Sequence, residues 1–575
     1  MGQDAIVQRE SIGKVGLHLT GGGRLRNRLL LWLLPLSFLA AFFFLPFARI
    51  LAYSFRGAAF SSANLNIVLN TLGFTVYQAI LSTLITLIVG LPAAYLFARY
   101  EFRAKALLRA LTAVPFMLPT VVVAAGFNAL LGARGLVNVL LMRSLGLNAP
   151  PVTFVGTLGA ILLAHVFYNT TIVIRIVGNA LSRFDPKLEQ AARSLGADRW
   201  RLWRTVYLPL LRPALSAACV LVFLFDFTSF GVILLLGGPA FATLEVQIYV
   251  QSLYYLNLPL AALLASIQLV CTLAFSIIYS RVLSNGQITI APRAAKSNAR
   301  QARLSGERLF VGAMIFLLIA LFILPMLALP IRSLSRLDAD RGQRTGFQTG
   351  LTTDYYSELF VNRRNSISYV PPFDAAMNSL GYAAATVLLS LVMGLPAAWA
   401  LAKPGRLEKV LDPILILPLG ASAVTLGLGF IVTFGRWLIY PWIVPLAHTL
   451  VALPFVIRTL QPALATIPER LRQAAAALGA SPFQVWQTVD WPILRRATLS
   501  AATFAFTISL GEFGATALVS RPDYPTIPIA IYRFLSQPGG LNYGQAMAMA
   551  TLLMAVATAG ILLIERWRLP GAGEF

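Results

Sequence analysis

Apolar residues in this chain gather in long runs that are separated by short polar stretches rich in arginine. A helix needs about 20 mostly apolar residues to cross the hydrocarbon core of a bilayer. The pattern predicts twelve such spans, and therefore an all-α, polytopic membrane protein. Six spans begin near Leu29, Leu72, Leu107, Val152, Pro213 and Leu256, and six begin near Leu309, Asn378, Val410, Tyr440, Ala497 and Asn542.

The first apolar run follows Arg24, Arg26 and Arg28, an arrangement similar to the front of a signal peptide. The run is longer than the apolar region of such a peptide, and no small-residue cleavage site precedes Arg49. We therefore expect it to be retained as a membrane helix.

Composition excludes a soluble globular protein and a disordered one. Of the residues, 58% are hydrophobic and only 12% are charged, and the mean hydropathy is +0.74. Soluble proteins carry about 25% charged residues, so this chain could not cover a water-facing surface of its size. The two cysteines, Cys219 and Cys271, lie inside apolar runs, at a spacing that predicts neither a disulfide framework nor a metal site.

The net charge of +24 is explained by where the basic residues lie. If the chain starts inside and each span changes sides, most of the 46 Lys and Arg residues fall in the internal loops and termini. This bias predicts that both termini are cytoplasmic. It also accounts for the charge without nucleic acid, because the aromatic residues lie in spans and not among the basic loops.

The chain contains an internal repeat. A shift of 283 residues aligns the two halves without a gap from Ala164 to Tyr249. Each half then holds six spans, and an even number gives both halves the same orientation. Two parallel halves indicate a pseudo-twofold axis along the membrane normal, with a pathway between them. Among the aligned identities are Ala164-His165 with Ala447-His448, Leu195-Gly196-Ala197 with Leu478-Gly479-Ala480, and Phe230-Gly231 with Phe513-Gly514.

The repeat also gives the expected domain organisation. The predicted units are a cytoplasmic N-terminal segment (1–28), the first six-span repeat (29–281), a cytoplasmic linker (282–307), the second six-span repeat (308–568) and a C-terminal tail (569–575).

The best-matched stretch is a cytoplasmic loop in each half, residues 185–212 and 468–495, here called the first and second loops. The sequence predicts a helix, a glycine turn at Gly196 and a second helix that exposes Trp200, Trp203 and Tyr207 beside arginines. One interpretation is an interfacial helix anchored among lipid headgroups. The other is a docking element for a cytoplasmic partner, since exposed aromatics with arginine are typical interface anchors. A glycine turn duplicated at fixed spacing favours docking.

These loops resemble the cytoplasmic Glu-Ala-Ala loop of binding-protein-dependent ABC importer permeases, which have a MetI-like fold. The resemblance extends over nearly all spans. In that family the loop is the coupling helix that sits in a groove of the ATPase subunit. The resemblance implies ATPase-coupling roles for Gln190, Ala191, Ala192, Gly196, Ala197, Trp203 and Pro209, and for Gln473, Ala474, Ala475, Gly479, Ala480, Trp486 and Pro492.

The same resemblance implies the partners and the location. They are two ATP-binding cassette subunits on the cytoplasmic side, an extracytoplasmic solute-binding protein and the lipid bilayer of a bacterial-type plasma (inner) membrane. The family usually has glutamate where Gln190 and Gln473 stand. With glutamine at this position, the ionic contact that the glutamate would make is in doubt, whereas the shape of the loop is expected to be retained.

The fused arrangement and two stretches near the end most resemble ferric-iron and thiamine permeases. The stretches are Gly511–Gly514 and Pro525–Tyr532, and sulfate and molybdate permeases share the first of them. The implied substrate is ferric iron or a thiamine-like cation, and an oxyanion is the alternative.

The chain carries no recognisable ATPase motif. Gly13-Lys14 lacks both the earlier glycine and the following hydroxyl of a phosphate-binding loop, and three histidines in 575 residues make no catalytic cluster. We therefore expect a transport subunit that is not itself an enzyme and has no cofactor of its own. Energy would come from a separate ATPase or, in the alternative of a secondary transporter, from a proton coupled through Asp226 and Glu512.

Asp226 and Glu512 are acids inside apolar spans, which makes them functional candidates by default. The repeat aligns Asp226 with Ser509, and Ser229 with Glu512. One interpretation is that these four residues line a pathway for a cationic substrate. The other is that the acids bond to neighbouring helices or stay protonated. His165 and His448 are interpreted as interhelical hydrogen-bond partners.

The long outer loop from Arg332 to Asp374 contains Asp354-Tyr355-Tyr356 and Asn362-Arg363-Arg364. It is interpreted as a solvated insertion with some helix. The alternative, implied by the resemblance, is a contact for the external binding protein.

Overall fold

The computed structural model describes residues 31–56, 59–285, 300–336, 350–361, 371–402 and 405–567. Within them the chain is almost entirely helical, apart from a parallel pairing of β1 (Tyr100–Glu101) with β2 (Arg300–Gln301) and an isolated bridge between Ser335 and Leu351. The expected terminal segments, most of the linker and Asn362-Arg363-Arg364 lie outside the described residues.

Nine helices in the described part of the chain are long and apolar enough to cross a membrane, and a bent helix pair makes a tenth candidate. The pair, Arg406–Pro418 and Ala423–Ile439, turns by 90° and stands where the span near Val410 is expected. The expected spans near Ala497 and Asn542 correspond to α24 (Trp491–Gly511) and α27 (Gly540–Trp567), which are not among the nine. In α24, the adjacent charges of Arg495 and Arg496 lower the hydropathy.

The third expected span is also different. The chain near Leu107 forms α5 (Lys105–Met117), which ends before Pro119, and the candidate span runs from Thr120 to Leu145. Proline lacks the amide N–H that would continue the helix, and it disfavours helical backbone in the residue before it.

The helices of the first half follow one another along the chain as η1 (Ala40–Phe44), α3 (Leu45–Ser54), α4 (Ser62–Arg99), α5, α6 (Thr120–Leu131), α7 (Leu136–Leu145), α8 (Leu158–Ser182), α9 (Pro186–Ser194), α10 (Arg199–Leu202), η2 (Trp203–Tyr207), α11 (Leu208–Phe227), α12 (Gly231–Leu236), η3 (Pro239–Phe241), α13 (Leu244–Leu253) and α14 (Leu258–Asn285).

The second half continues with α15 (Ser305–Phe322), α16 (Leu324–Ser333), α17 (Asp354–Ser357), η4 (Glu358–Phe360), α18 (Pro372–Ala402), α19 (Arg406–Gly420), α20 (Ala423–Phe434), η5 (Gly435–Ile439), α21 (Ile443–Ala465), α22 (Glu469–Ala477), α23 (Pro482–Val485), η6 (Trp486–Asp490), α24, α25 (Gly514–Val519), α26 (Ile527–Leu535) and α27.

The repeat seen in the sequence is also a repeat of structure. A shift of 283 residues carries the bounds of α9, α10, η2 and α12 onto those of α22, α23, η6 and α25 without change. Each half is built around three closely packed helices, α4, α8 and α11 in the first and α18, α21 and α24 in the second. Glycine allows this approach: a Cβ on Gly90 would lie 2.7 Å from Val173 Cβ, and one on Gly394 would lie 2.7 Å from Val456 Cγ1.

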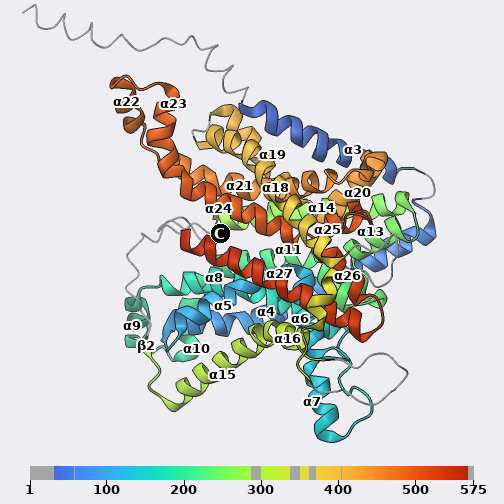
Figure 1. The fold of residues 1–575 in the computed structure, drawn as a ribbon. Helices are drawn as coiled ribbons and strands as arrows, with labels where there is room; N and C mark the ends of the chain where they lie inside the picture. Colours follow the sequence, from blue (N-terminus) through green and yellow to red (C-terminus); the bar gives the residue numbers. More distant parts are fainter. Residues whose placement is uncertain are drawn as a thin grey trace, which may run out of the picture.

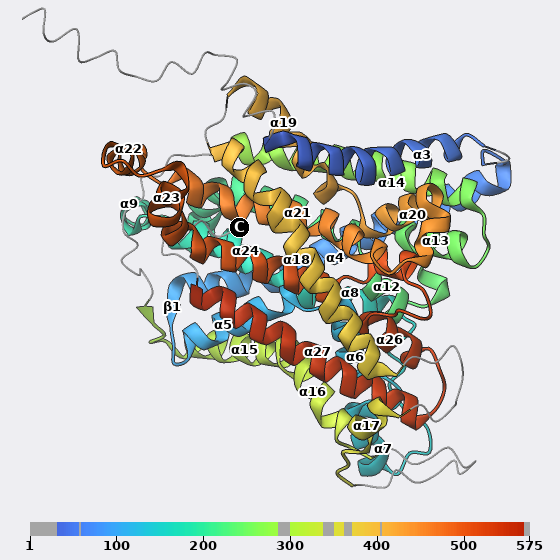
Figure 2. The same ribbon diagram turned by 45° about the horizontal axis from the view of Figure 1, so that its top comes forward.

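The first helices of the two halves are exchanged. The segment η1–α3 packs on α20 of the second half, and α16 packs on α6 of the first. Figures 1 and 2 both show α3 beside α20, and α15 and α16 along the opposite side with α5 and α6. Each crossing has a glycine–proline contact, Gly429 with Pro46 and Gly126 with Pro325, where an added Cβ would lie 2.9 Å away. The halves therefore complete each other's cores.

Candidate functional site

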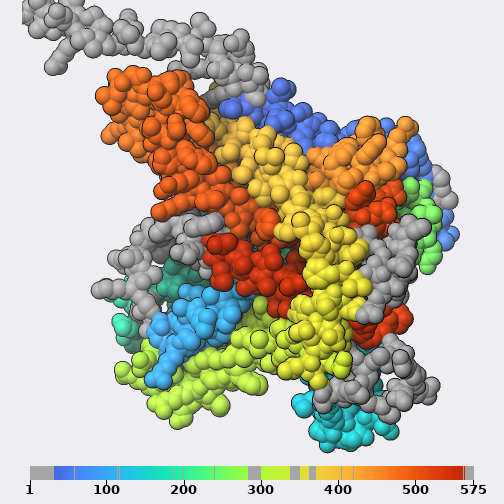
Figure 3. Space-filling view, viewed as in Figure 1, coloured from blue at the N-terminus to red at the C-terminus, as the bar shows by residue number. Residues whose placement is uncertain are grey.

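The two repeated loops lie at the same end of the molecule. Figures 1 and 2 both show α9 and the α22–α23 segment at the same end of the helices, apart from each other in Figure 1, and Figure 3 shows the α22–α23 segment projecting beyond the body of the protein. The loops reach this end because α8 and α11, and likewise α21 and α24, run the length of their halves. Two equivalent surfaces are therefore presented on one face.

Each loop turns at its glycine. Gly196 has a φ of +81° and Gly479 a φ of +84°, a left-handed conformation that residues with a Cβ adopt at a cost. The backbone hydrogen bonds around the two turns are the same: Ala197 N–H donates to Ala192 O at 3.0 Å, and Ala480 N–H donates to Ala475 O at 3.1 Å. The predicted helix–glycine–helix geometry is present in both copies.

A carboxylate fastens the first loop to the bundle. Glu189 accepts a hydrogen bond from the Tyr207 hydroxyl at 2.6 Å and from Arg99 Nη2 at 3.0 Å, and Arg193 Nη2 lies 2.7 Å from its other oxygen. Arg99 ends α4, so this cluster ties the loop to a membrane helix. Burial acts to raise the pKa of Glu189, but the Tyr207 hydrogen bond and the charges of Arg99 and Arg193 outweigh it and hold that pKa below its usual value.

The second loop carries a positive charge at the position where the first loop carries a negative one. Arg472 stands at the position equivalent to Glu189, and its Nε lies 2.8 Å from Asp490 Oδ1, where Asp490 is equivalent to Tyr207. The Arg472 guanidinium also lies 4.9 Å from the ring centroid of Trp399 on α18. Both loops are thus fastened by a charged contact at the same position, made by Glu189 with Arg99 of α4 in the first loop and by Arg472 with Asp490 of η6 in the second.

The faces that remain exposed are apolar. Leu195 and Leu478, beside the two glycines, are 88% and 89% exposed, and Trp200 and its equivalent Phe483 are 73% and 68% exposed. A membrane helix end that only contacted lipid headgroups would not need leucine at the tip of a tight turn. Equivalent apolar tips, with arginines beside the tip of the first loop, are typical of a protein interface.

The structure brings the predicted coupling residues together on these loops. Gln190 and Ala191, like Gln473 and Ala474, are exposed, while Ala192, Ala475, Ala197 and Ala480 are half-buried. Sequence reasoning was wrong about Tyr207, which is 5% exposed because its hydroxyl is held by Glu189.

The two tryptophans begin the π-helical turns that lead into the spans. Trp203 begins η2, with its ring 5.7 Å from Tyr95 and 5.0 Å from Tyr207. Trp486 begins η6, between Phe483 at 6.0 Å and Trp491 at 5.5 Å. Pro209 and Pro492 follow at the points where the π-helical turns pass into α11 and α24. These contacts join loop and span into one packed unit.

The candidate pathway acids lie in buried networks around two equivalent histidines. Asp226 is completely buried and accepts a hydrogen bond from Asn169 at 2.7 Å, and its Oδ1 lies 3.3 Å from His165 Nδ1. The other ring nitrogen of His165 lies 2.9 Å from Ser229 Oγ. His165 Nδ1 also lies 2.9 Å from Ser82 Oγ.

In the second half the acid and the serine change sides of the ring. His448 Nδ1 lies 2.7 Å from Ser509 Oγ, while Nε2 lies 3.3 Å from Glu512 Oε2. Glu512 accepts hydrogen bonds from the backbone N–H groups of Ala515 and Thr516 at 2.8 and 2.9 Å, and so caps α25. The arrangement agrees with the interpretation of the acids as partners of neighbouring helices, and the pathway role stays a prediction.

Sequence reasoning missed Glu245, a buried acid between the two halves. Glu245 on α13 is 0% exposed and accepts hydrogen bonds from Gln268 and, across the two halves, from Ser422 Oγ at 2.9 Å. The signal was available, since Glu245 follows Leu244 and precedes Val246 in an apolar context. It lies in a ten-residue helix too short to be recognised as a span.

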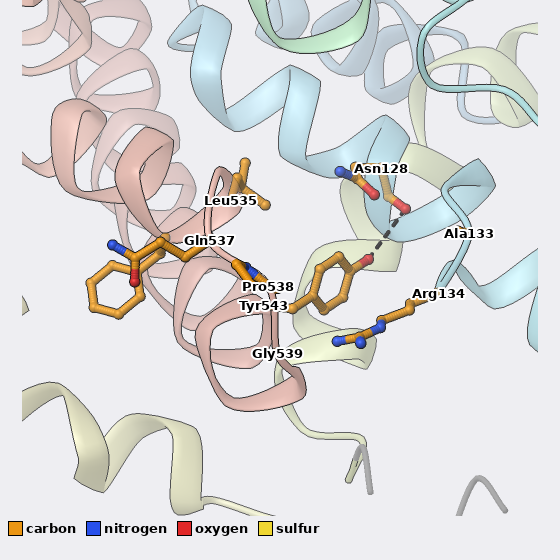
Figure 4. Close-up of a pocket in the computed structure, with 9 residues that line it drawn as sticks. Asn128, Ala133, Arg134, Leu535, Gln537, Pro538, Gly539 and Tyr543 are labelled. Atoms are coloured by element: carbon orange, nitrogen blue, oxygen red, sulfur yellow. Dashed lines mark hydrogen bonds between the residues drawn. The ribbon is translucent and has the colours of Figure 1, made fainter. Parts of the chain in front are cut away.

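A cavity of about 200 Å³ lies between the halves, at the end remote from the loops. Asn128, Ala133 and Arg134 line it from the first half, and the α26–α27 connection lines it from the second. Figure 4 shows the Tyr543 hydroxyl donating to the backbone carbonyl of Asn128, at 3.2 Å. No group of three or more His, Cys, Asp or Glu side chains that could hold a metal occurs in the described part of the chain.

Part of the predicted outer loop is packed on the bundle and is not a solvated insertion. Tyr355 is 4% exposed and fits against Gly544 of α27, where an added Cβ would lie 2.3 Å from the ring. The Tyr356 hydroxyl lies 2.7 Å from Ser333 Oγ.

Comparison with known proteins agrees with this architecture. The chain is similar to thiamine transport system permease proteins. It is 28% identical to that of Brucella abortus over 504 residues, which is 86% of each chain. It is 26% identical to that of Escherichia coli over 513 residues, 87% of this chain and 88% of the other. The protein from Haemophilus influenzae is 27% identical over 501 residues, 85% of this chain and 86% of the other.

The model of one family matches the chain twice, over residues 87–284 and 386–568, so that each half carries one copy with its loop. The two matches cover well over half of the chain and coincide with the structural repeat. The chain therefore belongs to the family of binding-protein-dependent transport system inner membrane components, as a fused ABC permease with two copies of the domain.

Proposed function

We propose that this chain forms the translocation pathway of an ATP-driven importer for thiamine or a thiamine-like organic cation. Each loop docks one ATP-binding cassette subunit on the cytoplasmic side, and a solute-binding protein delivers substrate to the opposite face. The family membership supports a permease that works with such partners in general. The duplicated loop is the observation that carries the more specific proposal of two docking sites.

The exposed tips supply the contact surface. Leu195 and Trp200 in the first loop, with Leu478 and Phe483 in the second, would lose most of their exposed apolar area in a groove. Burial of such anchors supplies the binding free energy of an interface. Gln190 and Gln473 are exposed on the same helices, so they offer the partner an uncharged hydrogen-bonding group where the family usually has a carboxylate.

The contacts between the loops and the membrane helices explain how a partner would drive transport. Trp203 and Trp486 join the loops to the π-helical turns, which continue directly into α11 and α24. Glu189 and Arg472 fasten the loops to other elements of the same half. When ATP closes two docked subunits, each loop moves with its partner and carries its half of the bundle. Alternating access follows from rocking of the two halves about the pathway.

The relatives favour an organic cation as substrate. Several are described as thiamine transport system permeases, whereas the expected alternative of ferric iron has no support among the relatives named above. Asp226 and Glu512, which are buried among the membrane helices, would favour a cation over an oxyanion, provided that they contribute to the pathway. We place the chain in a bacterial inner membrane with both termini cytoplasmic, because the basic residues concentrate on that side.

The test of docking is co-purification from the native membrane. We would replace Leu195 and Leu478 by serine in a tagged chain and quantify the ATP-binding cassette subunit that remains bound. Both leucines point away from the fold, so the permease should keep its yield and thermal stability while most of the ATPase is lost. Tyr255→Ser is the matched control, because Tyr255 is 70% exposed on the turn between α13 and α14, in neither loop.

The rival is a secondary transporter, which needs no docked ATPase. Thiamine uptake by proteoliposomes that contain this chain alone, driven by a proton gradient, would support the rival and overturn the proposal. Uptake that requires the ATPase subunit, the binding protein and ATP, and that Leu195→Ser with Leu478→Ser abolishes, would support it.

A further inference from the structure

The rings of Phe230 and Phe513 stack on each other across the two halves. Their centroids are 5.5 Å apart and their planes differ by 23°. The two residues are equivalent in the repeat, 283 positions apart. When equivalent residues of two related halves touch each other, the contact lies on the axis that relates them. The stacked pair therefore marks the pseudo-twofold axis, along which the pathway of a two-half permease runs.

The rings lie where two membrane helices are interrupted. Helix α11 ends at Phe227 and α12 begins at Gly231, while α24 ends at Gly511 and α25 begins at Gly514. Non-helical backbone at membrane depth is tolerated only where protein buries it or where it lines a cavity, and interrupted helices at a repeat interface commonly surround transport sites. Both breaks place their phenylalanine at the junction between the halves.

Two tyrosines complete the cluster. The ring of Tyr249 lies 5.4 Å from Phe230, and that of Tyr532 lies 5.6 Å from Phe513. These tyrosines are also equivalent in the repeat, so each half contributes one phenylalanine and one tyrosine. Phe230, Phe513 and Tyr249 are 7%, 2% and 5% exposed, which means that the rings fill the space on the axis.

The depth of the cluster follows from the helix lengths. Helix α11 has 20 residues and α24 has 21, so each extends for roughly 30 Å from its loop to its break. That distance is about the thickness of the hydrocarbon core. With the loops on the cytoplasmic side, the four rings lie toward the external end of the pathway.

We propose that Phe230, Phe513, Tyr249 and Tyr532 form the external constriction of the pathway, closed in this structure by the stacked phenylalanines, and that a flat organic cation passes between the four rings when they part. This proposal rests on the proposed transport function. It assigns the site at which the substrate touches the permease and the chemistry of that contact.

Aromatic faces suit this task for two reasons. Stacked rings exclude water and ions from a closed gate without a covalent or charged contact that must be broken. When separated, their faces attract a cation electrostatically and stack on a heteroaromatic ring. The carboxylate of Glu512 caps α25 and Oδ1 of Asp226 accepts a hydrogen bond from Asn169, whereas the rings of Phe230 and Phe513 have no polar partner to give up when they part.

The first test measures closure. The complete complex, purified with its ATPase, would be reconstituted in vesicles preloaded with radiolabelled thiamine, and passive efflux without ATP would be recorded. Phe230→Ala with Phe513→Ala should raise efflux at least tenfold, and Phe230→Tyr with Phe513→Tyr should stay as tight as the parent chain. Phe227→Ala is the matched control, since this completely buried ring packs on Phe223 and Phe275 of its own half.

The second test measures contact. One 4-fluorophenylalanine at position 513 gives a single fluorine resonance in the complex. Trapping the ATPase with ATP and vanadate should shift it as the stack opens, and thiamine should shift it further while sulfate should not. The proposed constriction would be overturned if vanadate trapping leaves the fluorine resonance unshifted. It would also be overturned if efflux is the same in the double alanine variant and in Phe227→Ala. A resonance that responds to sulfate as to thiamine would overturn the cation contact.

Failure of this inference is distinguishable from failure of the proposed function. If ATP-driven thiamine uptake by the parent complex is present while the two tests are negative, only the constriction is wrong. If the parent complex takes up no thiamine, the proposed substrate is wrong, and the response of the resonance to trapping still decides whether the stack is a gate.

Discussion

Glu189 and Arg472 occupy equivalent positions in the two loops and carry opposite charges. Each is held by a partner from η2 or η6, Tyr207 for the first and Asp490 for the second. This change of charge from Glu189 to Arg472 keeps the shape of the loop but changes the electrostatic potential at its base. The two proposed docking surfaces are therefore alike in their apolar tips and different in the electrostatics behind them.

We expect the Arg472–Asp490 pair to be required for the second loop. Asp490 is 3% exposed, and Arg472→Met would leave its carboxylate buried without its charge partner, which costs about 3 kcal/mol. Thermal unfolding of the purified permease should show the loss. The charge swap Arg472→Asp with Asp490→Arg should recover part of it.

Arg458→Ala is the control for that experiment. Arg458 pairs with Asp412 at 3.0 Å, but both side chains are more than 30% exposed, so the change should cost less than about 1 kcal/mol. Equal losses in Arg458→Ala and Arg472→Met would contradict a special role for the second-loop pair.

The first loop should loosen in acid. The pKa of Glu189 is lowered in the folded protein, so its stabilisation is complete above the ordinary carboxyl pKa and disappears as pH falls through the lowered value. Hydrogen exchange of residues 186–207, corrected for the intrinsic rate at each pH, should show constant protection near neutrality and a loss below about pH 4. Glu189→Gln should abolish this dependence; an unchanged profile in that variant would assign it to another group.

Alanine at the two turn glycines should weaken docking through the backbone alone. An added Cβ at Gly196 or Gly479 would meet no atom within 4 Å, so the cost is that of the left-handed conformation, about 1–2 kcal/mol. Gly196→Ala with Gly479→Ala should reduce ATPase co-purification. Gly312→Ala, at an open helical position, should be neutral or slightly stabilising.

Asp226→Asn should weaken thiamine uptake while assembly with the ATPase stays intact. The amide keeps the size of the carboxylate and the acceptor for Asn169, and it removes the negative charge from the centre of the first half. Uptake kinetics at equal membrane levels provide the measurement. Unchanged transport would leave Asp226 as a structural partner of His165 only.

Valine at Gly429 or Gly126 should disturb the contact between the halves. A Cβ at either position would lie 2.9 Å from Pro46 or Pro325, and overpacking of this kind costs about 1–3 kcal/mol. Thermal unfolding should show a lower midpoint for each variant. Gly381→Val on α18, where nothing lies within 4 Å, should leave the midpoint near that of the parent chain.

The sequence was sufficient for the class of fold, because twenty-residue apolar runs and a faithful repeat are local signals. It also located the turns at Gly196 and Gly479, since their neighbours are duplicated. It failed where tertiary contacts decide. Tyr207 has the composition of an exposed aromatic beside arginines, and a carboxylate eighteen residues earlier in the chain buries it.

The bounds of the membrane spans also depend on tertiary contacts that the sequence does not show. Proline at 119 indicates a break, but only packing reveals that the chain before it forms α5 and that the candidate span begins at Thr120. The 90° bend before Ala423 likewise depends on contacts of α20 with α3 and α25. Phe230 and Phe513 were recognisable as duplicated residues, yet no one-dimensional pattern tells that two copies of a residue touch.

The exchanged first helices have a consequence for how the protein is made. Helix α3 ends at Ser54, and its packing partner in the second half, α20, begins at Ala423, so at 5–20 residues per second a ribosome needs roughly 20–70 s to supply that partner. During this interval the aromatic face of Trp32, Phe38 and Phe43 rests against lipid or an insertion factor. Biogenesis of the first half is thus incomplete until most of the second has been translated, and a nascent chain stalled between them should be a preferred target of membrane quality control.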